Sequence, residues 1–183
     1  EFVFVIGYLG EKIKEYVERT YPNIKKNYVV QETREGLGHA IWLTKEVIPK
    51  NSEVMIVLGD TIIDVDLKSF IALTSSALGV KKVSDPRKFG VVEFDQDGNI
   101  IRVVEKPTIP KSNMAIVGLY KIKEFDILIK SLGHIIKNNI RSNNEFYLTE
   151  GLQEMIRRGV KVEGFKVDNW YDCGQKEVLL NTN

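Results

Sequence analysis

Val54-Met-Ile-Val-Leu-Gly-Asp60 is a short apolar run that ends in a glycine and an acidic residue. Such a run is typical of a strand that is covered on both faces, as in a parallel sheet. Residues 2–6 and 28–31 show two more strand patterns, and apolar residues recur with helical spacing in residues 11–20 and 40–47 between them. This alternation predicts an α/β fold with a doubly wound, mostly parallel sheet, whose functional loops lie at the carboxyl ends of the strands.

The second half of the chain has a different pattern. Residues 90–94 and 99–105 are rich in strand-forming residues, and the Asp95-Gln-Asp-Gly98 turn between them predicts a hairpin, because Asp-Gly suits positive φ. This hairpin would be a small antiparallel insertion in the fold. We expect one domain over residues 1–183, with further helices at 66–77, 125–135 and 148–156, strands at 78–83, 114–122 and 160–167, and a short helix after Gly174.

The composition excludes several classes of function. The 183 residues include 26 basic and 25 acidic side chains, a net charge of +1, so the charge favours neither nucleic acid nor a membrane surface as a partner. No apolar run approaches the roughly 18 residues that span a bilayer. Cys173 is the single cysteine, so we expect no internal disulfide and no cysteine-rich zinc site, and a cytoplasmic location is the default.

Two acidic residues are candidates for binding a metal ion. Asp60 directly follows a buried strand, so its carboxylate would lie in the crevice where α/β sheets bind ligands. Mg²⁺ typically takes one or two protein carboxylates, together with water and substrate phosphates. Asp172 could share that crevice if its segment lay beside the one that ends at Asp60. Each residue has an ordinary alternative as a turn or capping residue, and the sequence alone leaves that choice open.

Four further residues could bind a substrate. Glu105 and Lys106 stand at a strand end, where a carboxylate could accept hydrogen bonds from sugar hydroxyls and an ammonium group could bind a phosphate. Gln31 ends a strand, and its amide could recognise the edge of a base. The turn that begins at Gly36 could bring backbone amides close to a ligand. Taken one at a time, a surface ion pair and an ordinary turn explain these residues as well.

The sequence offers little for covalent catalysis. It has no serine elbow, no plausible Cys/His pair and no cluster of histidines that could bind zinc. His39 and His134 are expected to be ordinary helix residues. Transfer chemistry on this chain would therefore depend on positioning and on charge.

Several short segments, taken in their order along the chain, form a pattern that is more specific than any one of them. They are Phe4-Val-Ile-Gly-Tyr-Leu9, Gln31 with Gly36-Leu-Gly-His-Ala-Ile41, Leu58-Gly-Asp60, Asp85-Pro86 with Phe89-Gly-Val-Val-Glu93, Glu105-Lys-Pro107, Ser112-Asn113 with Gly118-Leu-Tyr120, and Trp170-Tyr-Asp-Cys-Gly174. Together they resemble the sugar-1-phosphate nucleotidyltransferases, the family of glucose-1-phosphate thymidylyltransferase and UTP-glucose-1-phosphate uridylyltransferase. The resemblance extends over nearly the whole chain.

The resemblance implies a Rossmann-like nucleotidyltransferase fold and a reaction. The oxygen of a sugar-1-phosphate, expected to be glucose-1-phosphate, would attack the α-phosphorus of dTTP or UTP and give a nucleotide sugar and pyrophosphate. The matching positions imply Asp60 and Asp172 as ligands of Mg²⁺, Gly90 and Glu105 as contacts of the sugar, Lys106 as the contact of its phosphate, and Gln31 and Gly36 as contacts of the base. With Asp60, Lys106 and Asp172, catalysis would consist of alignment and charge neutralisation. Assembly into a homo-oligomer is compatible with the sequence.

The chain departs from the family at its start. In the family, a glycine-rich loop follows the first strand and cradles the triphosphate, and this chain contains no Gly-x-Gly-x-x-Gly. We therefore expect that the first strand, the glycine-rich loop and the first helix of the domain are missing from this sequence. The chain alone is then expected to be catalytically silent or nearly so, and its longer parent to be the enzyme.

Two other hypotheses remain open. A shortened homologue could bind sugar phosphate or nucleotide without turnover, and an upstream glycine-rich loop in the parent gene would argue against that. A nucleotide-sugar glycosyltransferase would hold its metal with two acids separated by one residue, right after a strand. Asp64-Val65-Asp66 has that spacing, but it comes where a helix cap is expected.

Overall fold

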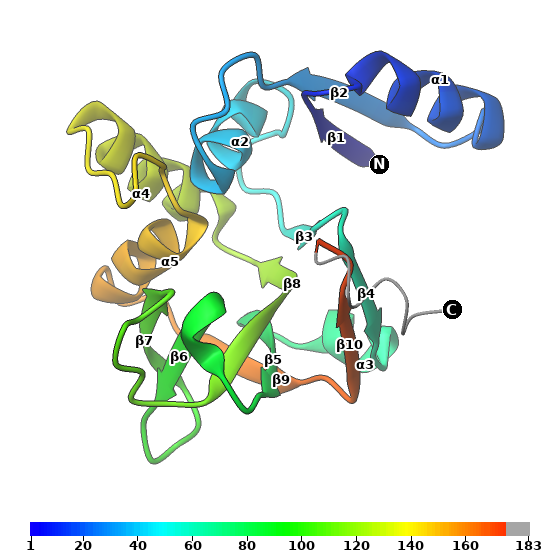
Figure 1. Ribbon diagram of the computed structural model, residues 1–183. Helices are drawn as coiled ribbons and strands as arrows, with labels where there is room; N and C mark the ends of the chain where they lie inside the picture. Colours follow the sequence, from blue (N-terminus) through cyan, green and yellow to red (C-terminus); the bar gives the residue numbers. More distant parts are fainter. Residues whose placement is uncertain (175–183) are drawn as a thin grey trace.

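Strands and helices alternate along the first half of the chain as the sequence predicts, and the fold belongs to the mixed α/β class (Figure 1). The computed structural model describes residues 1–174. The helices are α1 (Gly10–Thr20), α2 (Leu37–Leu43), α3 (Leu67–Ala72), α4 (Phe125–Lys137) and α5 (Leu148–Arg157). The strands are β1 (Phe2–Ile6), β2 (Lys26–Val30), β3 (Val54–Val57), β4 (Thr61–Asp64), β5 (Ser76–Lys82), β6 (Gly90–Phe94), β7 (Ile100–Glu105), β8 (Met114–Ile122), β9 (Val162–Lys166) and β10 (Asn169–Asp172).

The central sheet is built around β8. It has six strands. Five of them lie in the order β7-β6-β8-β5-β9, and the sixth, β3, pairs with β8. The nine residues of β8 are long enough for β6 to pair near its start, at Ala115, and for β3 to pair near its end, from Leu119 to Ile122. All of β8 after Met114 is buried. This strand therefore holds the sheet together.

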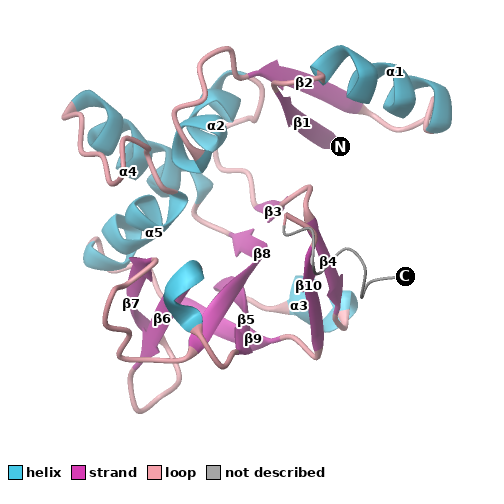
Figure 2. Ribbon diagram, in the orientation of Figure 1, coloured by secondary structure: helices cyan, strands magenta, loops and turns pink. Residues whose placement is uncertain are grey.

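Most strand pairs are antiparallel, so the expectation of a mostly parallel sheet is wrong for the described residues. Across residues 1–174, β1 with β2 and β5 with β9 are the parallel pairs, whereas β8 runs antiparallel to β3, β5 and β6. The chain leaves β5, forms the β6–β7 hairpin and returns as β8 beside β5, so β8 runs in the opposite direction. The hairpin predicted as a small insertion is thus part of the central sheet (Figure 2).

The first and third strands are also less buried than predicted. β1 and β2 form a separate parallel pair, connected by α1. Phe2 of β1 is 56% exposed, and Met55 and Val57 of β3 are 45% and 52% exposed. These exposed side chains show that neither β1 nor β3 is covered on both faces. Among the described residues, β1 pairs with β2 and β3 pairs with β8, so each strand also has one unpaired edge.

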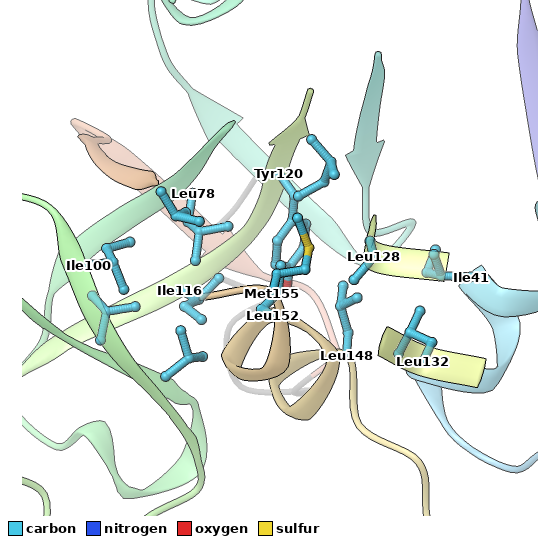
Figure 3. Packing of buried hydrophobic residues seen from close by; sticks show 14 of the residues in the cluster. Ile41, Leu78, Ile100, Ile116, Tyr120, Leu128, Leu132, Leu148, Leu152 and Met155 are labelled. Atoms are coloured by element: carbon cyan, nitrogen blue, oxygen red, sulfur yellow. The ribbon is translucent and has the colours of Figure 1, made fainter. Parts of the chain in front are cut away.

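The main core lies where α2, α4 and α5 pack on one face of the central sheet (Figure 3). Leu132 of α4 and Leu152 of α5 have no exposed surface, and both belong to the same cluster as Tyr120 of β8. Gly151 lets the helices approach closely, because a methyl group there would come 2.5 Å from Leu132 Cδ2. This packing fixes the first turn of α5 near the ends of β6 and β7.

A smaller apolar cluster occupies the opposite face of the sheet. Alternate residues of β8, Val117 and Leu119, contribute to it, because successive side chains of a strand point to opposite faces. Phe70 of α3 and Trp170 of β10 join them, so the cluster positions α3 and the β4–β10 pair. Neither β4 nor β10 was predicted, and Asp172, for which a turn was one of the expected alternatives, ends a strand.

Two remaining expectations concern the ends of elements and the membrane. The helix predicted for residues 66–77 ends at Ala72, and Ala77 belongs to β5. The short helix expected after Gly174 lies outside the described residues. Within residues 1–174, every helix is too short or too polar to cross a bilayer.

Candidate functional site

The pairing of β4 with β10 brings Asp60 and Asp172 together. Asp60 directly precedes β4, and the register places Asp172 opposite Thr61. Cys173 N donates a hydrogen bond to Asp60 O at 2.8 Å, which extends the pairing by one step. Trp170 Nε1 donates to Thr61 Oγ1 at 2.8 Å and links the two strands through their side chains. The structure thus gives the two aspartates the adjacency that the sequence left open.

Gly174 lies against both carboxylates. A methyl group on Gly174 would come 3.1 Å from Asp172 Oδ1 and 3.2 Å from Asp60 Oδ2, and Gly174 N donates to Asp172 Oδ1 at 3.1 Å. Two carboxylates that flank one small space fit a hard divalent cation, which completes its shell with water and phosphate. In the part of the chain described here, no group of three or more His, Cys, Asp or Glu side chains is placed to hold a metal ion. A cation between these aspartates would therefore depend on water and substrate for its other ligands.

Gly90, Glu105 and Lys106 meet where β6 and β7 are paired. Gly90 lies opposite Glu105, and a methyl group at Gly90 would come 3.4 Å from Glu105 Oε2. Lys106 has a φ of 39°, so the chain turns out of β7 directly after Glu105. Lys106 Nζ lies 3.8 Å from Glu105 Oε1 and 5.6 Å from the centre of the Tyr147 ring. The residues that the resemblance assigned to the sugar phosphate therefore form one cluster, which we call the Glu105 cluster.

Thr149 supplies a contact that the sequence did not predict. From the first turn of α5, its Oγ1 donates to Glu105 Oε2 at 3.1 Å. Burial raises the pKa of Glu105 above its ordinary value. The hydrogen bond from Thr149 and the charge of Lys106 lower this pKa, and the charges of Glu145 and Glu150 raise it. The site thus holds a largely buried carboxylate against one fixed donor.

Asp60 and Glu105 both lie within electrostatic reach of one buried group. That group is the phenol of Tyr120, whose pKa is raised first by burial and then by the negative charges of Glu105 and Asp60. Tyr120 belongs to β8; β5 pairs along one edge of this strand, so β3 and β6 pair along the other edge, where the end of β3 and the start of β6 approach each other. The two sets of acids therefore lie around the same part of the central sheet.

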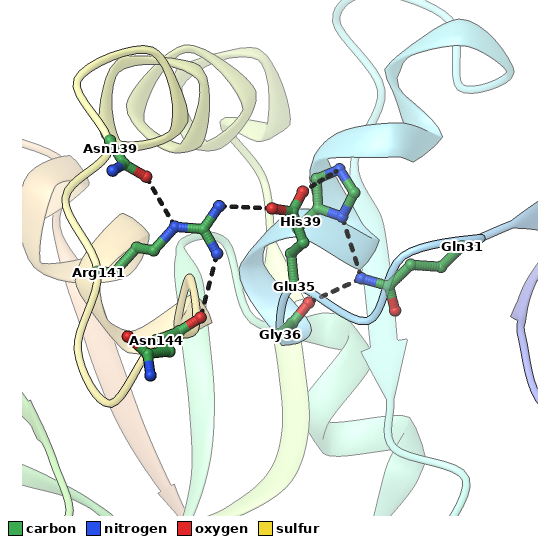
Figure 4. A network of polar contacts seen from close by, with 7 residues as sticks. All are labelled: Gln31, Glu35, Gly36, His39, Asn139, Arg141 and Asn144. Carbon is green, nitrogen blue, oxygen red and sulfur yellow. Dashed lines mark hydrogen bonds and ion pairs between the residues drawn. The ribbon is translucent and has the colours of Figure 1, made fainter.

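Gln31 and His39 belong to a polar network that joins three segments (Figure 4). Gln31 Nε2 donates to Gly36 O at 3.0 Å and lies 3.1 Å from His39 Nδ1. His39 Nε2 lies 3.6 Å from Glu35 Oε2, and the other oxygen of Glu35 accepts from Arg141. The hydrogen bond and the charge of Arg141 lower the pKa of Glu35. The loop before α5 is thereby tied to the strand end at Gln31.

Gly36 is required by packing, whatever its role toward a ligand. Its φ of 99° is rarely adopted by other residues, and a methyl group there would come 2.7 Å from Phe146 O. Phe146 N donates to Glu35 O at 2.8 Å, and Gly38 N donates to Phe146 O at 2.7 Å. The start of α2 and the residues before α5 therefore form one unit.

Sequence reasoning missed Thr149, Tyr147, Glu35 and Arg141. The segment before α5 is polar and rich in asparagine, and it has neither strand nor helix periodicity. Only the packing of α5 against the sheet brings it to the site. His39 lies in α2, as expected of a helix residue, and the structure adds two polar contacts that the sequence did not predict.

Comparison with known proteins connects this arrangement to a family. The family model described as "Nucleotidyl transferase" matches residues 3–183. The chain belongs to the nucleotidyl transferase family. The resemblance drawn from the sequence motifs is confirmed, and the nucleotidyltransferase relatives of this chain include sugar-phosphate enzymes.

Two relatives illustrate the match. The chain is 35% identical over 180 residues to the bifunctional protein GlmU of Methanocaldococcus jannaschii, and the alignment covers 98% of this chain and 41% of that protein. It is 27% identical over 185 residues to the UTP–glucose-1-phosphate uridylyltransferase AglF of Haloferax volcanii, and this alignment covers 97% of this chain and 73% of AglF. The chain thus spans about two fifths of the length of the GlmU relatives that it matches.

Solved structures show the same nucleotidyltransferase fold. A UDP-glucose pyrophosphorylase complexed with UDP-glucose aligns with a TM-score of 0.80 and 24% identity, over 99% of this chain and 78% of that one. A putative glucose-1-phosphate thymidylyltransferase from Bacillus anthracis aligns with a TM-score of 0.76 and 23% identity, over 99% and 74%. The fold predicted from the motifs is therefore confirmed.

Proposed function

We propose that the protein transfers a nucleotidyl group from UTP or dTTP to a sugar-1-phosphate, with glucose-1-phosphate as the first candidate, and releases pyrophosphate. The main support is the placement of the aspartate pair and the Glu105 cluster around the same part of the sheet. Asp60 and Asp172 are suited to a cation that neutralises the triphosphate, and Lys106 is suited to the phosphate of the sugar. The names of AglF and of the UDP-glucose complex point to the same substrate class.

In the proposed reaction, a phosphate oxygen of the sugar-1-phosphate forms a bond to the α-phosphorus of the nucleoside triphosphate. The bond from the α-phosphorus to the bridging oxygen breaks, and its electron pair leaves with pyrophosphate. Lys106 binds the sugar phosphate, and Asp60 and Asp172 would hold Mg²⁺. When bound, that ion supplies neutralisation of the charge on the phosphates.

The remaining side chains bind and orient the substrates. Glu105 accepts hydrogen bonds from sugar hydroxyls while Thr149 holds its second oxygen. Gly90 would contact the sugar through its backbone beside Glu105, where a methyl group would crowd Thr149 Cγ2 and Ile116 Cδ1, at 3.0 Å and 3.2 Å. Gln31 and Gly36 contact the base. No side chain of the chain is covalently modified.

The glycosyltransferase hypothesis is less well supported. Asp66 Oδ1 accepts from Lys68 N and Ser69 N, both at 3.1 Å, and so caps α3. Asp64 Oδ2 accepts from Asn169 Nδ2 at 3.1 Å across the β4–β10 pair. Both carboxylates therefore have structural partners on the protein.

The test is pyrophosphate release by the form extended upstream in its natural gene, with Mg²⁺, a panel of triphosphates and several sugar-1-phosphates. We expect Asp60→Asn and Asp172→Asn each to lower kcat by about 100-fold, as loss of one charge-stabilising group typically does. Asp97→Asn, at an exposed position of the β6–β7 turn, is the matched control and should leave the rate unchanged. Wild-type rates in both aspartate variants would overturn the assignment.

We also propose that these 183 residues alone turn over slowly, because they contain no Gly-x-Gly-x-x-Gly for the triphosphate. The same assay compares this chain with a form extended upstream in its natural gene. Equal rates in the two forms would refute this proposal. An extended form that binds nucleotide but releases no pyrophosphate would instead support the non-catalytic homologue.

A further inference from the structure

We propose that His39 fixes the direction in which the Gln31 amide faces, and thereby makes the site select a base that presents an N–H donor, such as the imide of uracil or thymine. The proposal rests on the proposed function, in which Gln31 contacts the base. His39 is then a positioning residue that sets base specificity without touching the nucleotide.

Gly36 identifies which end of the Gln31 amide points inward. A carbonyl oxygen can only accept a hydrogen bond, so the Gln31 atom that lies 3.0 Å from Gly36 O must be the amide nitrogen Nε2. The same nitrogen lies 3.1 Å from His39 Nδ1. Both inward contacts use Nε2, and Oε1 is left facing away from the network (Figure 4).

His39 Nδ1 must then be an acceptor, and this fixes the tautomer of the ring. The proton of the neutral ring lies on Nε2, 3.6 Å from Glu35 Oε2. Glu35 is held in turn by Arg141, whose Nε donates to Asn139 Oδ1 at 2.7 Å and whose Nη1 donates to Asn144 O at 3.1 Å. A doubly protonated ring would set an N–H of His39 against an N–H of Gln31.

The ring of His39 has little freedom to turn away. Its side chain is 13% exposed, and it stacks on Trp42 with 6.2 Å between ring centres and 25° between planes. The backbone around it is also fixed, because Gly38 N donates to Phe146 O. The acceptor at Nδ1 is therefore a fixed feature of the site.

An outward acceptor discriminates between pyrimidines. Uracil and thymine present N3–H, which Gln31 Oε1 can accept, whereas cytosine presents a lone pair at N3. Two acceptors that face each other at a desolvated site make no hydrogen bond, and both lose their bonds to water. Reversal of the amide would favour cytosine, and His39 with Gly36 prevents that reversal.

The tautomer can be tested without any nucleotide. A long-range nitrogen–proton NMR spectrum of the histidine rings at neutral pH should show His39 with a protonated Nε2 and an unprotonated Nδ1. His39→Asn serves to assign the signal. An Nδ1–H tautomer or an imidazolium at this position would overturn the proposal while leaving the proposed function intact.

Base selection is tested by the ratio of CTP to UTP dissociation constants, measured by calorimetry on the wild type and on variants of Gln31, His39 and Arg158. We expect a ratio of at least about 10 in the wild type, and a decrease of about threefold or more in His39→Ala, the effect of losing one neutral hydrogen bond. His39→Asn, whose Oδ1 can only accept, should restore most of the ratio. Arg158→Ala, which removes a surface partner of Glu154, is the control and should leave the ratio unchanged.

The outcomes separate this proposal from the proposed function. If the form extended upstream in its natural gene binds no nucleotide, or if Gln31→Ala changes no affinity, the assignment of Gln31 fails and this proposal fails with it. If Gln31→Ala weakens UTP binding but His39→Ala keeps the wild-type ratio, the positioning role alone is refuted. Equal weakening of both nucleotides in His39→Ala would mark a general structural effect and would also refute it.

Discussion

Glu105 shows how burial and two neighbouring side chains set the pKa of one carboxylate. Burial raises its pKa, while the Thr149 hydroxyl and the Lys106 ammonium lower it. Its oxygens are divided between these partners, with Oε2 on Thr149 and Oε1 facing Lys106. The balance favours a carboxylate that takes up a proton at higher pH than an ordinary glutamate.

The raised pKa predicts the pH dependence of sugar-phosphate binding. As the pH falls from 7, Glu105 is protonated earlier than an ordinary glutamate, so it loses an acceptor and KM for the sugar-1-phosphate should rise. Glu105→Gln should bind more weakly at pH 7 but lack this rise. The measurement is the ratio of the two KM values from pH 7 to 5, in which the titration of the sugar phosphate cancels; a constant ratio would contradict the prediction.

The same shift has a consequence for stability. A raised folded-state pKa means that the ionised side chain costs stability in the fold, fully at a pH above both pKa values and not at all below the ordinary value. Glu105→Gln should therefore unfold at higher urea concentration than the wild type at pH 7. The difference should shrink as the pH falls toward 4, and growth of the difference in that direction would refute the prediction.

Thr149 provides a matched pair of substitutions. Thr149→Val keeps the shape but removes the hydroxyl donor, so the pKa of Glu105 should rise further and KM for the sugar-1-phosphate should increase about fivefold, the effect of one net hydrogen bond. Thr149→Ser keeps the donor and should remain near the wild type. Equal KM values for Val and Ser would show that the hydroxyl does not act through Glu105.

At the scale of elements, the β4–β10 pair is a small structure with a large effect on the site. Four residue pairs and the hydrogen bond from Trp170 to Thr61 hold Asp60 beside Asp172. Trp170 also packs edge-on against Phe89, with 4.8 Å between ring centres. The geometry of the aspartate pair therefore depends on a short antiparallel pairing, which Thr61 Oγ1 ties to the central sheet by donating to Val117 O at 3.0 Å.

Trp170→Phe should weaken this pairing while keeping an aromatic ring against Phe89. Loss of the bond to Thr61 Oγ1 is expected to cost about 0.5–1.5 kcal/mol of unfolding free energy and to lower the affinity for Mg²⁺ several-fold. Thr61→Val removes the same bond from the other side. Thr61→Val also removes the bond that Thr61 Oγ1 donates to Val117 O at 3.0 Å, so adding Trp170→Phe to Thr61→Val should cost little more. Full additivity of the two variants in urea unfolding would show that the bond is not shared.

At the scale of the whole molecule, one core supports both substrate sites. The α2–α4–α5 layer packs on the sheet through fully buried leucines, and it carries the loop of Arg141 and the first turn of α5 with Thr149. The start of α2 is tied to the same layer through Gly36 and Phe146. Damage to this core should therefore reach the base site and the sugar site together.

Leu152→Ala tests the role of this core. Its side chain has no exposed surface, so the cavity left behind is expected to cost about 2–5 kcal/mol of unfolding free energy. Ile109→Ala, at a position that is 85% exposed, is the control and should change stability by less than about 0.5 kcal/mol. Chemical denaturation measures both, and similar values for the two variants would contradict the assignment of the core.

The sequence by itself determined the mixed α/β class, most helix and strand positions, the β6–β7 hairpin and the family, because apolar periodicity, Asp-Gly turns and motif order are local properties. Only the tertiary structure decided that β8 runs antiparallel to its neighbours and that β4 pairs with β10. It alone placed Thr149 on Glu105 and Arg141 on Glu35. These contacts join residues distant in the chain, and their geometry depends on how helices pack on the sheet, which no local pattern encodes.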